Sequence, residues 1–388
     1  MINAVHIIAS LDPRSGGTSV SVPALVNAIA STGRYQQRLL CFHGKSECSA
    51  ISIPEVEVIC LPWDPAGLWF GKARRAVLEF ILQSDLVHIH GIWQAHCAVA
   101  GGICRRANKP FLVSAHGMLE PWALRNKRWK KSPYSALVER RNLRAAACLR
   151  ALTLSEISDY RRYGLSVPAA LIPNGIDLPS SLDPAAFYLK YPGLAGKRLV
   201  LFLSRVHYKK GVDILCRAWA SVARDFPNAH LVIAGPDFEG TLAKVEALVG
   251  KLHLKDRVTF TGMLGDADKW AAFAAAECFV LPSHSEGFSV AVLEALAASL
   301  PVIVTPGCNF SEVAQAGCGA IVAPEAEKIA CALRTLLNCT PQERAAMGRR
   351  GRELVESRYA WPAIGERMAA VNDWVVGDAP APDDVSRS

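Results

Sequence analysis

Two glutamates, Glu286 and Glu294, stand in a stretch that is otherwise built from small and apolar side chains, SHSEGFSVAVLEALAASLPVIV. Residues 278–283 predict a buried strand, and residues 290–298 predict a helix that ends before a proline. Glu286 lies in the loop between these two elements. Glu294 projects near the apolar face of the helix, where an unpaired carboxylate is costly. Carboxylates in these two places indicate either contacts to a ligand or a helix-start glutamate followed by a buried ion pair.

The start of the predicted helix offers a place for an anion between the two carboxylates. The backbone amides of Phe288, Ser289 and Val290 would point at a bound diphosphate, and Ser289 has the position of an N-cap. In this arrangement Glu294 accepts hydrogen bonds from a vicinal diol on one side, and Glu286 does so on the other. A sugar nucleotide has this shape, because it carries ribose, diphosphate and sugar in line.

A second strand-to-helix turn lies near the N-terminus, where Gly16 and Gly17 precede Thr18 in LDPRSGGTSV. Two adjacent glycines allow close approach of the backbone, and the N-terminus of the following helix favours an anion. The spacing matches neither G-x-G-x-x-G nor a P-loop, so a plain tight turn is the alternative interpretation.

The elements that must position these residues alternate along the whole chain. Continuous apolar runs rich in β-branched residues are separated by helical patterns, which predicts parallel strands buried on both faces. Two such sets predict an α/β fold of two doubly wound, Rossmann-like domains that face a cleft. The expected parts are an N-terminal domain over 1–175, a C-terminal domain over 176–360, a helix over 361–376 that returns to the first domain, and a disordered tail over 377–388.

Composition narrows the class of protein. The chain has 388 residues, of which 51% are hydrophobic and 20% charged, as in a packed globular protein. Its 12 cysteines contain no C-x-x-C pair, which favours buried thiols in a reducing compartment. No run approaches the roughly 20 apolar residues of a membrane span, and the N-terminus predicts a strand and not a signal peptide. We therefore expect a cytoplasmic protein.

The segment E-G-F-S-x-x-x-x-E at 286–294, followed by A-L-A-A-S-x-P-V-I-V-T, resembles the E-x7-E signature of retaining glycosyltransferase family 4, which has the GT-B fold. LFLSRVHYKKGVDIL is similar to the Arg…Lys-Gly segment of that family, and IPNGID at 172–177 to its interdomain hinge. SLDPRSGG and SAHGM are similar to its N-terminal loops. The resemblance runs from about Val5 to Trp374, and the block HGMLEPWALRNKRWKK looks like that of members that build bacterial exopolysaccharide or O-antigen on lipid carriers.

The resemblance implies transfer of a hexose-type sugar, with retention, from a UDP- or GDP-linked donor to a lipid-linked saccharide in cell-surface polysaccharide biosynthesis. Arg205 and Lys210 would neutralise the departing nucleotide without a metal or other cofactor. Glu286 would orient the donor sugar without becoming a covalent nucleophile. The implied catalytic residues are Glu286, His116, Arg205 and Lys210, and the implied donor-binding residues are Gly16, Gly17, Arg205, Lys210, Met263, Leu264, Glu286, Gly287, Phe288, Ser289, Val290 and Glu294.

Two other hypotheses stay open, one for an enzyme and one for a protein without catalytic activity. They are a nucleotide-sugar 2-epimerase of the same fold and a catalytically silent partner subunit of another transferase. The presence of Glu286 and Lys210 disfavours the silent subunit. Asp266 and Asp268 form a literal D-x-D metal motif, but they open a predicted helix, where aspartates complement the dipole. We therefore expect no metal.

A basic segment follows the SAHGM turn. Nine basic residues between Arg125 and Arg150 accompany one acid, Glu139. Interleaved tryptophans and cations predict docking on an anionic membrane surface without crossing it, at the inner face of the plasma membrane. Nucleic acid is the rival partner, but no nucleic-acid module is recognisable, and a solvated helix face is the structural alternative. The residues expected on the acceptor and membrane side are His90, Trp122, Arg125, Lys127, Arg128, Lys130 and Lys131.

Overall fold

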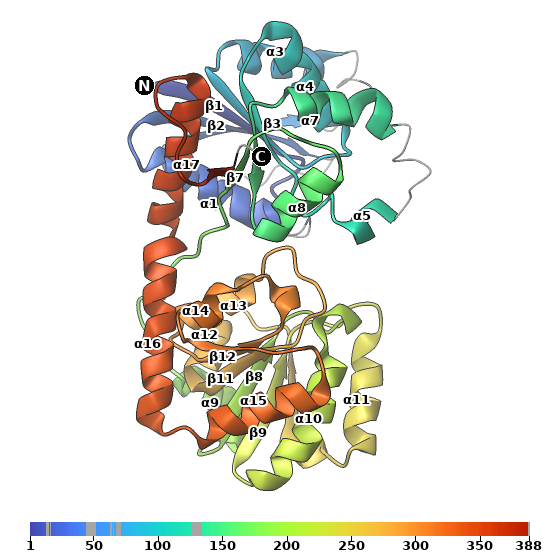
Figure 1. Cartoon of the computed structure of the whole chain (residues 1–388), viewed down its shortest axis with the longest axis vertical. Helices are drawn as coiled ribbons and strands as arrows, with labels where there is room; N and C mark the ends of the chain where they lie inside the picture. Colours follow the sequence, from blue (N-terminus) through green and yellow to red (C-terminus); the bar gives the residue numbers. More distant parts are fainter. Residues whose placement is uncertain are drawn as a thin grey trace. The chain divides into compact units, whose positions relative to one another are not determined.

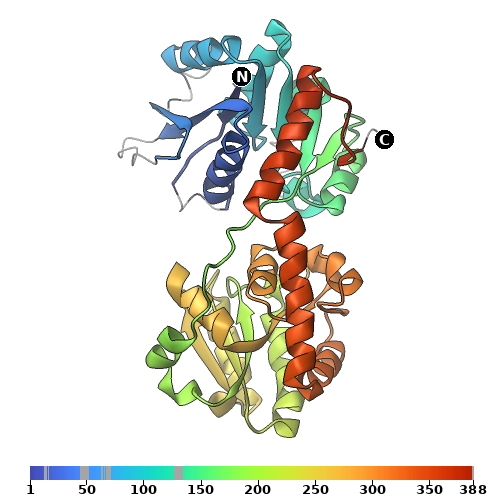
Figure 2. The same ribbon diagram turned by 90° about the vertical axis from the view of Figure 1, so that its left-hand side faces the viewer.

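The computed structural model describes residues 1–12, 15, 17–43, 52–62, 64, 66, 71–125 and 134–386. The chain divides into two compact units: the first comprises Met1–Gly175 and Trp361–Ser388, and the second Ile176–Ala360. In each unit, helices cover both faces of a central sheet (Figures 1 and 2). Both units are therefore doubly wound α/β structures, as the sequence predicted.

The second unit has a six-stranded parallel sheet in the order β10-β9-β8-β11-β12-β13. The chain runs outward from β8 through β9 and β10, and then returns to the other side of β8 with β11, so the topological switch point lies between β8 and β11. The strands are β8 (Arg198–Leu203), β9 (Ala229–Ala234), β10 (Val258–Gly262), β11 (Ala276–Leu281), β12 (Val302–Val304) and β13 (Gly319–Ile321). The helices are α9 (Ala185–Lys190), α10 (Val212–Asp225), α11 (Thr241–Lys251), α12 (Asp266–Ala275), α13 (Val290–Ala297), α14 (Glu312–Gln315), α15 (Ala326–Asn338) and α16 (Pro341–Arg358), with short turns η3 (Pro192–Leu194), η4 (Tyr208–Lys210), η5 (Lys255–Arg257) and η6 (Pro306–Cys308).

The first unit repeats this plan in a sheet of order β14-β7-β6-β5-β4-β1-β2-β3, which puts its switch point between β1 and β4. The strands are β1 (Ile2–Ile7), β2 (Tyr35–His43), β3 (Val56–Pro62), β4 (Leu86–His90), β5 (Phe111–Ser114), β6 (Cys148–Ala151), β7 (Ala169–Leu171) and β14 (Val385–Ser386). The helices are α1 (Thr18–Ala30), α3 (Lys72–Leu82), α4 (Ala95–Ala107), α5 (Pro121–Arg125), the π-helical turn η2 (Ser135–Glu139), α7 (Arg140–Ala145), α8 (Leu154–Arg162) and α17 (Trp361–Val376).

Strand alternation divides the apolar residues of the first unit between two faces. Val5 and Ile7 pack with α3 and α4, whereas Ala4 packs with α1 and α17 on the other side (Figure 1). Eight free cysteines, from Cys41 to Cys318, are buried in the cores of the two units. Apolar residues on both faces explain why the strands of this unit are continuous apolar runs in the sequence.

The C-terminal tail differs from the disordered segment that the sequence predicted. Val385–Ser386 forms β14, which pairs antiparallel with β7. Arg367 of α17 donates two hydrogen bonds to the carboxylate of Asp384, at 3.0 and 2.6 Å. Few apolar side chains are involved, because main-chain pairing and one ion pair hold the segment, and the composition of GDAPAPDD therefore gave no indication of order.

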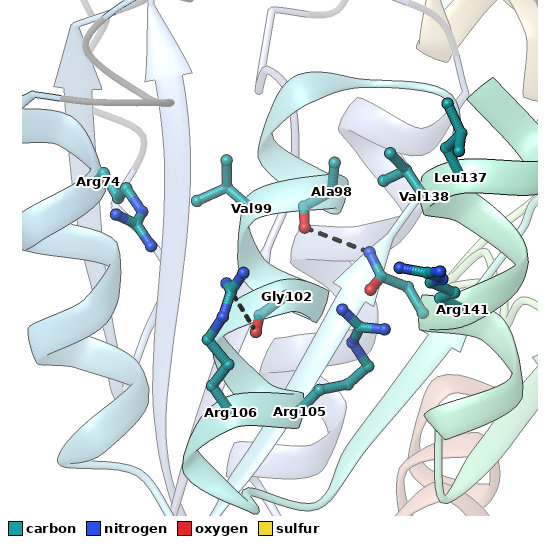
Figure 3. Close-up of a pocket in the computed structure, with 10 residues that line it drawn as sticks. Arg74, Ala98, Val99, Gly102, Arg105, Arg106, Leu137, Val138 and Arg141 are labelled. Atoms are coloured by element: carbon teal, nitrogen blue, oxygen red, sulfur yellow. Dashed lines mark hydrogen bonds between the residues drawn. The ribbon is translucent and has the colours of Figure 1, made fainter. Parts of the chain in front are cut away.

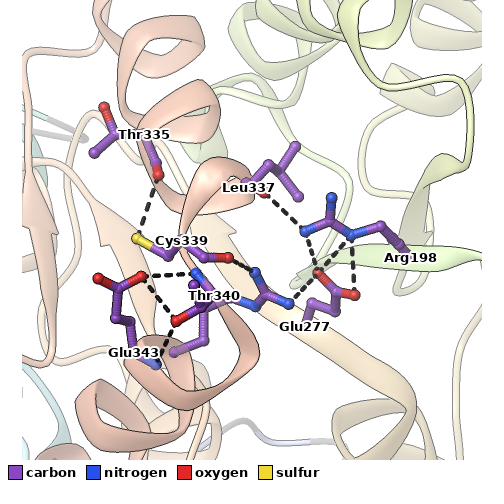
Figure 4. Close-up of polar contacts among 8 residues, drawn as sticks. Arg198, Glu277, Thr335, Leu337, Cys339, Thr340 and Glu343 are labelled. Atoms are coloured by element: carbon purple, nitrogen blue, oxygen red, sulfur yellow. Dashed lines mark hydrogen bonds and ion pairs between the residues drawn. The ribbon is translucent and has the colours of Figure 1, made fainter.

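A polar network anchors the beginning of β8 (Figure 4). The guanidinium of Arg198 donates hydrogen bonds to both carboxylate oxygens of Glu277, at 2.9 to 3.1 Å. Arg344 of α16 lies 3.2 Å from the same carboxylate. A capping box between Thr340 and Glu343 begins α16. The network stabilises the end of β8 opposite to the loop that carries Arg205.

The contact between α17 and α1 yields a test of the packing. A Cβ at Gly365 would lie 2.3 Å from the carbonyl oxygen of Ala28. Alanine in a helix normally stabilises by about 1 kcal/mol relative to glycine. In Gly365→Ala we expect the opposite sign, a loss of roughly 1–3 kcal/mol from overpacking, measured by thermal unfolding.

Gly193→Ala is the control, because nothing lies within 4 Å of a Cβ there. We expect its stability to change by less than about 0.5 kcal/mol. Equal melting temperatures for the two variants would contradict the close packing of α17 on α1.

Candidate active site

Two loops meet at the switch point of the second unit, one after β8 and one after β11. The first carries Arg205 and Lys210, and the second carries Glu286. The Nζ of Lys210 lies 2.5 Å from Oε2 of Glu286, and the two side chains are 14% and 8% exposed. The structure thus brings together two predicted site residues that are 76 positions apart in the chain.

Hydrogen bonds hold Glu286 in one orientation. The Ser283 hydroxyl lies 2.6 Å from Oε1 of the carboxylate. The amide of Glu286 donates to the carbonyl of Gly307 at 2.8 Å, and its carbonyl accepts from the Asn309 side chain at 2.6 Å. Both carboxylate oxygens and both main-chain groups therefore have partners. Sequence reasoning missed Ser283 and Asn309. Ser283 precedes Glu286 by three residues, whereas Asn309 carried no local signal.

Two glycines allow these loops to approach so closely. Gly211 has φ of 67°, and a Cβ on it would lie 2.1 Å from the carbonyl oxygen of Pro282. A Cβ on Gly307 would lie 2.5 Å from the carbonyl oxygen of Ser283. A side chain at Gly211 would force the loops after β8 and β11 apart, and the distance between Lys210 and Glu286 would then increase. A side chain at Gly307, which follows β12, would push that turn away from the loop that carries Glu286.

Cationic and amide donors lie at the same end of the sheet. Arg205 is exposed, and its guanidinium carbon lies 4.8 Å from the centre of the Phe238 ring. In the part of the chain that the structure describes, the amides of Gly287, Phe288 and Ser289 donate no backbone hydrogen bond. These amides precede α13, where the helix dipole favours an anion.

Ser289 has the N-cap position that the sequence predicted, but its side chain makes no capping hydrogen bond. Its φ of −89° is ordinary for any L-residue. Serine is therefore unstrained at this position.

Glu294 has a lysine partner that the sequence did not predict. Oε1 of Glu294 lies 2.7 Å from the Nζ of Lys269 on α12, and the same Nζ lies 2.8 Å from Asp266. Burial raises the pKa of the Glu294 carboxyl, and the charge of Lys269 partly opposes that rise. Burial alone would lower the pKa of Lys269, but the two carboxylates raise it. The buried-pair interpretation of Glu294 is confirmed, and a diol contact would have to coexist with this pair.

The D-x-D sequence lies in the first turn of α12, where the two aspartates pair with lysines. Asp266 pairs with Lys269, and Asp268 with Lys190 at 2.8 Å. Gly265 has the N-cap position, so the aspartates complement the helix dipole without capping through their side chains. Two other predicted donor-site residues, Met263 and Leu264, lie in the loop after β10, and Met263 is 77% exposed.

In the first unit, the structure connects three histidines in a chain of hydrogen bonds. His6 Nδ1 lies 3.0 Å from His90 Nε2, and His90 Nδ1 lies 3.3 Å from His116 Nε2. Burial, and then the charge of Arg150, lower the pKa of His6 and of His116 to about 3 each. At neutral pH these two rings are uncharged, and each has one nitrogen that donates and one that accepts a hydrogen bond. The hydrogen bonds from His6 through His90 therefore determine which ring nitrogen of His116 carries the hydrogen atom.

The ring nitrogens of His6, His88 and His90 lie within 4.8 Å of one another, a grouping of the kind that binds metal. Burial is the largest cause that lowers the pKa of all three rings, and the charge of Arg150 adds a smaller effect in the same direction. A neighbouring charge that opposes a proton also opposes a metal cation. The group therefore fits a hydrogen-bonded chain better than a metal site.

A buried carboxylate that sequence reasoning missed holds the turn that carries His116. His116 and Gly117 both have positive φ, 53° and 75°. Glu156 accepts hydrogen bonds from the amides of Gly117, at 2.7 Å, and of Leu152, at 2.8 Å. Burial raises the pKa of this carboxyl. Glu156 is a positioning residue of the turn, and its distance of 39 residues from Gly117 explains why no motif revealed it.

The remaining predicted residues lie at or beyond the limits of the described chain. Gly17 is the N-cap residue of α1, with φ of −59° and open space around a Cβ, so the turn does not require glycine there. The residues that lie outside the described ranges, or whose side chains do, are Gly16, Trp122, Arg125, Lys127, Arg128, Lys130 and Lys131.

Two doubly wound units, one of them with the pair of Lys210 and Glu286 at its switch point, define a GT-B architecture. Comparisons with known proteins agree. The model for "Glycosyl transferase 4-like domain" matches residues 16–175, and that for "Glycosyl transferases group 1" matches residues 190–354. Together these models match most of the chain, which belongs to the GT4-type glycosyltransferases.

Individual relatives are distant. D-inositol 3-phosphate glycosyltransferase of Kineococcus radiotolerans is 29% identical over 347 residues, which are 81% of this chain and 76% of that protein. A GDP-mannose-dependent monoacylated alpha-(1-6)-phosphatidylinositol monomannoside mannosyltransferase of Corynebacterium glutamicum is 30% identical over 214 residues. That match covers 52% of this chain and only 55% of the relative.

Among solved structures, Anabaena Alr3699/HepE in complex with UDP superposes with a TM-score of 0.76 at 19% identity, covering 96% of this chain and all of that one. The likeness establishes the fold.

The pair of Glu294 and Lys269 makes a pH-dependent prediction. In Lys269→Ala the Glu294 carboxylate loses its counter-charge, so its folded-state pKa rises further above the unfolded value. A carboxyl with a raised folded-state pKa loses stability as the pH rises through that pKa. We expect a loss of about 2 kcal/mol near pH 7, because the pair is not fully buried, and a smaller loss near pH 4.

Denaturant unfolding at the two pH values measures this difference. Lys190→Ala is the matched control, since it removes a lysine from an exposed pair with Asp268. It should change stability little at either pH. A loss in Lys269→Ala that does not depend on pH would contradict the assignment.

Proposed function

We propose that the protein transfers a hexose-type sugar from a nucleotide-sugar donor to a saccharide acceptor, with retention at the anomeric carbon. The observation that carries the proposal is the pair of Lys210 and Glu286 at the switch point, beside the amides that precede α13. Doubly wound sheets bind nucleotides at this position. A cation, a carboxylate and an amide cluster there suit a diphosphate joined to a sugar.

In the proposed reaction, the bond between the anomeric carbon and the β-phosphate oxygen breaks as the acceptor oxygen bonds to the same carbon. The acceptor proton passes to an oxygen of the departing phosphate. Arg205 and Lys210 stabilise the charge that develops on the diphosphate, and the amides of Phe288 and Ser289 assist. No metal takes part.

Glu286 orients the hydroxyls of the donor sugar. Its two carboxylate oxygens already contact Lys210 and Ser283, which suits an orienting group better than a covalent nucleophile. The neutral ring of His116 completes the proposed catalytic set from the first unit. Glu294 contacts the ribose, and the loop with Met263 and Leu264 contacts the base.

A UDP- or GDP-linked donor is proposed on the basis of the relatives. The Corynebacterium relative is described as GDP-mannose-dependent, and the Anabaena structure holds UDP. The melting temperature of the protein with UDP, GDP or ADP identifies the base, because a ligand stabilises the folded state that binds it.

We further propose that the acceptor is lipid-linked and that the enzyme serves cell-surface polysaccharide biosynthesis from the cytoplasmic face of the plasma membrane. The Corynebacterium relative acts on a phosphatidylinositol mannoside, by its description. In the described residues, no helix is long and apolar enough to span a membrane. The proposed attachment is peripheral and uses the basic segment that follows His116 in the sequence.

Glu286→Gln separates the sugar contact from the phosphate contacts. Gln keeps the size of the side chain and the contact with Ser283, but it loses the charge. We expect kcat to fall at least about a hundredfold, while the Kd for the nucleoside diphosphate stays within about threefold of the parent value. Kinetics and calorimetry measure the two quantities.

Lys210→Ala is the contrasting variant, because it removes a charge-assisted phosphate contact. Its Kd for the nucleoside diphosphate should rise about tenfold or more. Donor incubated without acceptor is the control for epimerase chemistry. Parental turnover in Glu286→Gln, or an epimerised donor in the absence of acceptor, would overturn the proposal.

Membrane attachment is tested by sedimentation with anionic and neutral vesicles at low and high salt. In a Lys127, Arg128, Lys130, Lys131→Ala variant we expect loss of pelleting with anionic vesicles, since each cation near such a surface contributes on the order of 1 kcal/mol. Unchanged pelleting of the variant, or equal pelleting of the parent with both vesicle types, would disprove attachment through this segment.

A further inference from the structure

A cavity of about 350 Å³ lies in the first unit between α3, α4 and the η2–α7 segment. Four arginines line it: Arg74 from α3, Arg105 and Arg106 from α4, and Arg141 from α7. Figure 3 shows Arg105 and Arg141 on one side of α4, and Arg74 and Arg106 on the other. No aspartate or glutamate is among the lining residues that the structure describes.

Within the described part of the chain, the four guanidinium groups lack partners of opposite charge. None forms an ion pair with a described residue, and the nearest polar contact is from Arg106 to the carbonyl of Gly102, at 3.4 Å. The Nε of Arg105 is buried and has no hydrogen-bond partner among the described residues. A buried donor without an acceptor costs free energy, and like charges around one cavity repel each other. An anion in the cavity would relieve both costs.

The rest of the wall is rigid and closely packed. Asn142 of α7 donates to the carbonyl of Ala98 on α4 at 3.2 Å. A Cβ at Gly101 would lie 2.7 Å from the Asn142 side chain, so α4 and α7 cannot move closer. The arginines therefore project from helices that are held at a set spacing, as a preformed anion site requires.

We propose that this cavity binds a ligand with two phosphate groups. A diphosphate carries several negative charges near pH 7, which four arginines can balance. The guanidinium fork suits the bidentate binding of phosphate oxygens. The cavity also falls within the size of small-molecule sites, roughly 300–1,000 Å³, and exceeds the need of a single phosphate.

This site is independent of the proposed donor site, because its residues belong to the first unit, whereas Arg205, Lys210 and Glu286 belong to the second. The diphosphate has two possible sources, a soluble molecule and the headgroup of a lipid. Both sources carry the same diphosphate group, and the experiments below distinguish a soluble ligand from a lipid.

The test is calorimetric titration of the full chain with inorganic pyrophosphate at constant ionic strength. All proteins carry Lys210→Ala, which weakens pyrophosphate binding at the donor site. On this background, Arg74→Gln with Arg141→Gln should raise the Kd for pyrophosphate at least about tenfold. Both side chains are exposed, so folding should persist, as circular dichroism and melting temperature can verify.

The matched control is Arg75→Gln with Arg144→Gln. These arginines lie on the same two helices and are exposed, but they do not line the cavity. The control removes the same charge, and its Kd should stay within about twofold of the background value. A Kd unchanged in the cavity variant, or raised equally in the control, would overturn the proposal. Arg105→Gln is a second cavity variant, because the Nε of Arg105 is buried, and we expect it to raise the Kd for pyrophosphate as well.

Vesicles of neutral phospholipid that contain farnesyl diphosphate provide the lipid arm. If the cavity variant loses binding to these vesicles and the control variant keeps it, the cavity can bind the diphosphate headgroup of a lipid. Binding of pyrophosphate without vesicle binding identifies a soluble ligand. If neither probe distinguishes the cavity variant from the control, the cavity is not a diphosphate site.

Discussion

The ion pair between Lys210 and Glu286 is the interaction on which the site in the second unit depends. A lysine and a glutamate that are both largely buried must stay together, because removing one would leave the other charge unpaired. The pair therefore holds the loop after β8 against the loop after β11. Gly211 makes this contact possible, since a Cβ there would meet the carbonyl of Pro282, and Gly307 allows the turn after β12 to approach the loop of Glu286 as closely. A substrate that meets this pair finds a cation and a carboxylate already in place.

The two units share one topology but present different chemistry at their switch points. In the second unit a charged pair and unbonded amides meet at the ends of β8 and β11, which suits a charged ligand. In the first unit His90 ends β4 and His116 follows β5, and burial keeps the ring of His116 neutral. A neutral imidazole supplies a hydrogen bond without an added charge. The same fold therefore presents charged groups at one switch point and neutral imidazole rings at the other.

Charge in the first unit is unevenly distributed between its buried interior and its surface. Arg150 is buried, and its hydrogen bonds to the carbonyls of Ile172 and Pro173 replace the water that it would otherwise bind. Burial is the larger cause of the lowered pKa of His6 and of His116, and the positive charge of Arg150 adds to it. Of the arginines around the α3–α4–α7 cavity, Arg106 has one long contact, to the carbonyl of Gly102, and Arg141 has no carbonyl partner among the described residues. The difference separates a structural cation from cations that are available to a ligand.

The sequence by itself determined the fold class and the order of most strands and helices, because apolar runs and helical periods are local properties of the chain. It also placed Glu286 in a loop after a strand, and α13 directly behind it. The tertiary structure alone decided the partners: Lys210 for Glu286, Lys269 for Glu294, and β7 for the tail that had been expected to be disordered. Such partners depend on which strands lie side by side and on which helix faces which loop. Crossover connections determine which strands are neighbours in a parallel sheet. The distance between two residues along the chain therefore does not reveal whether they lie on neighbouring strands.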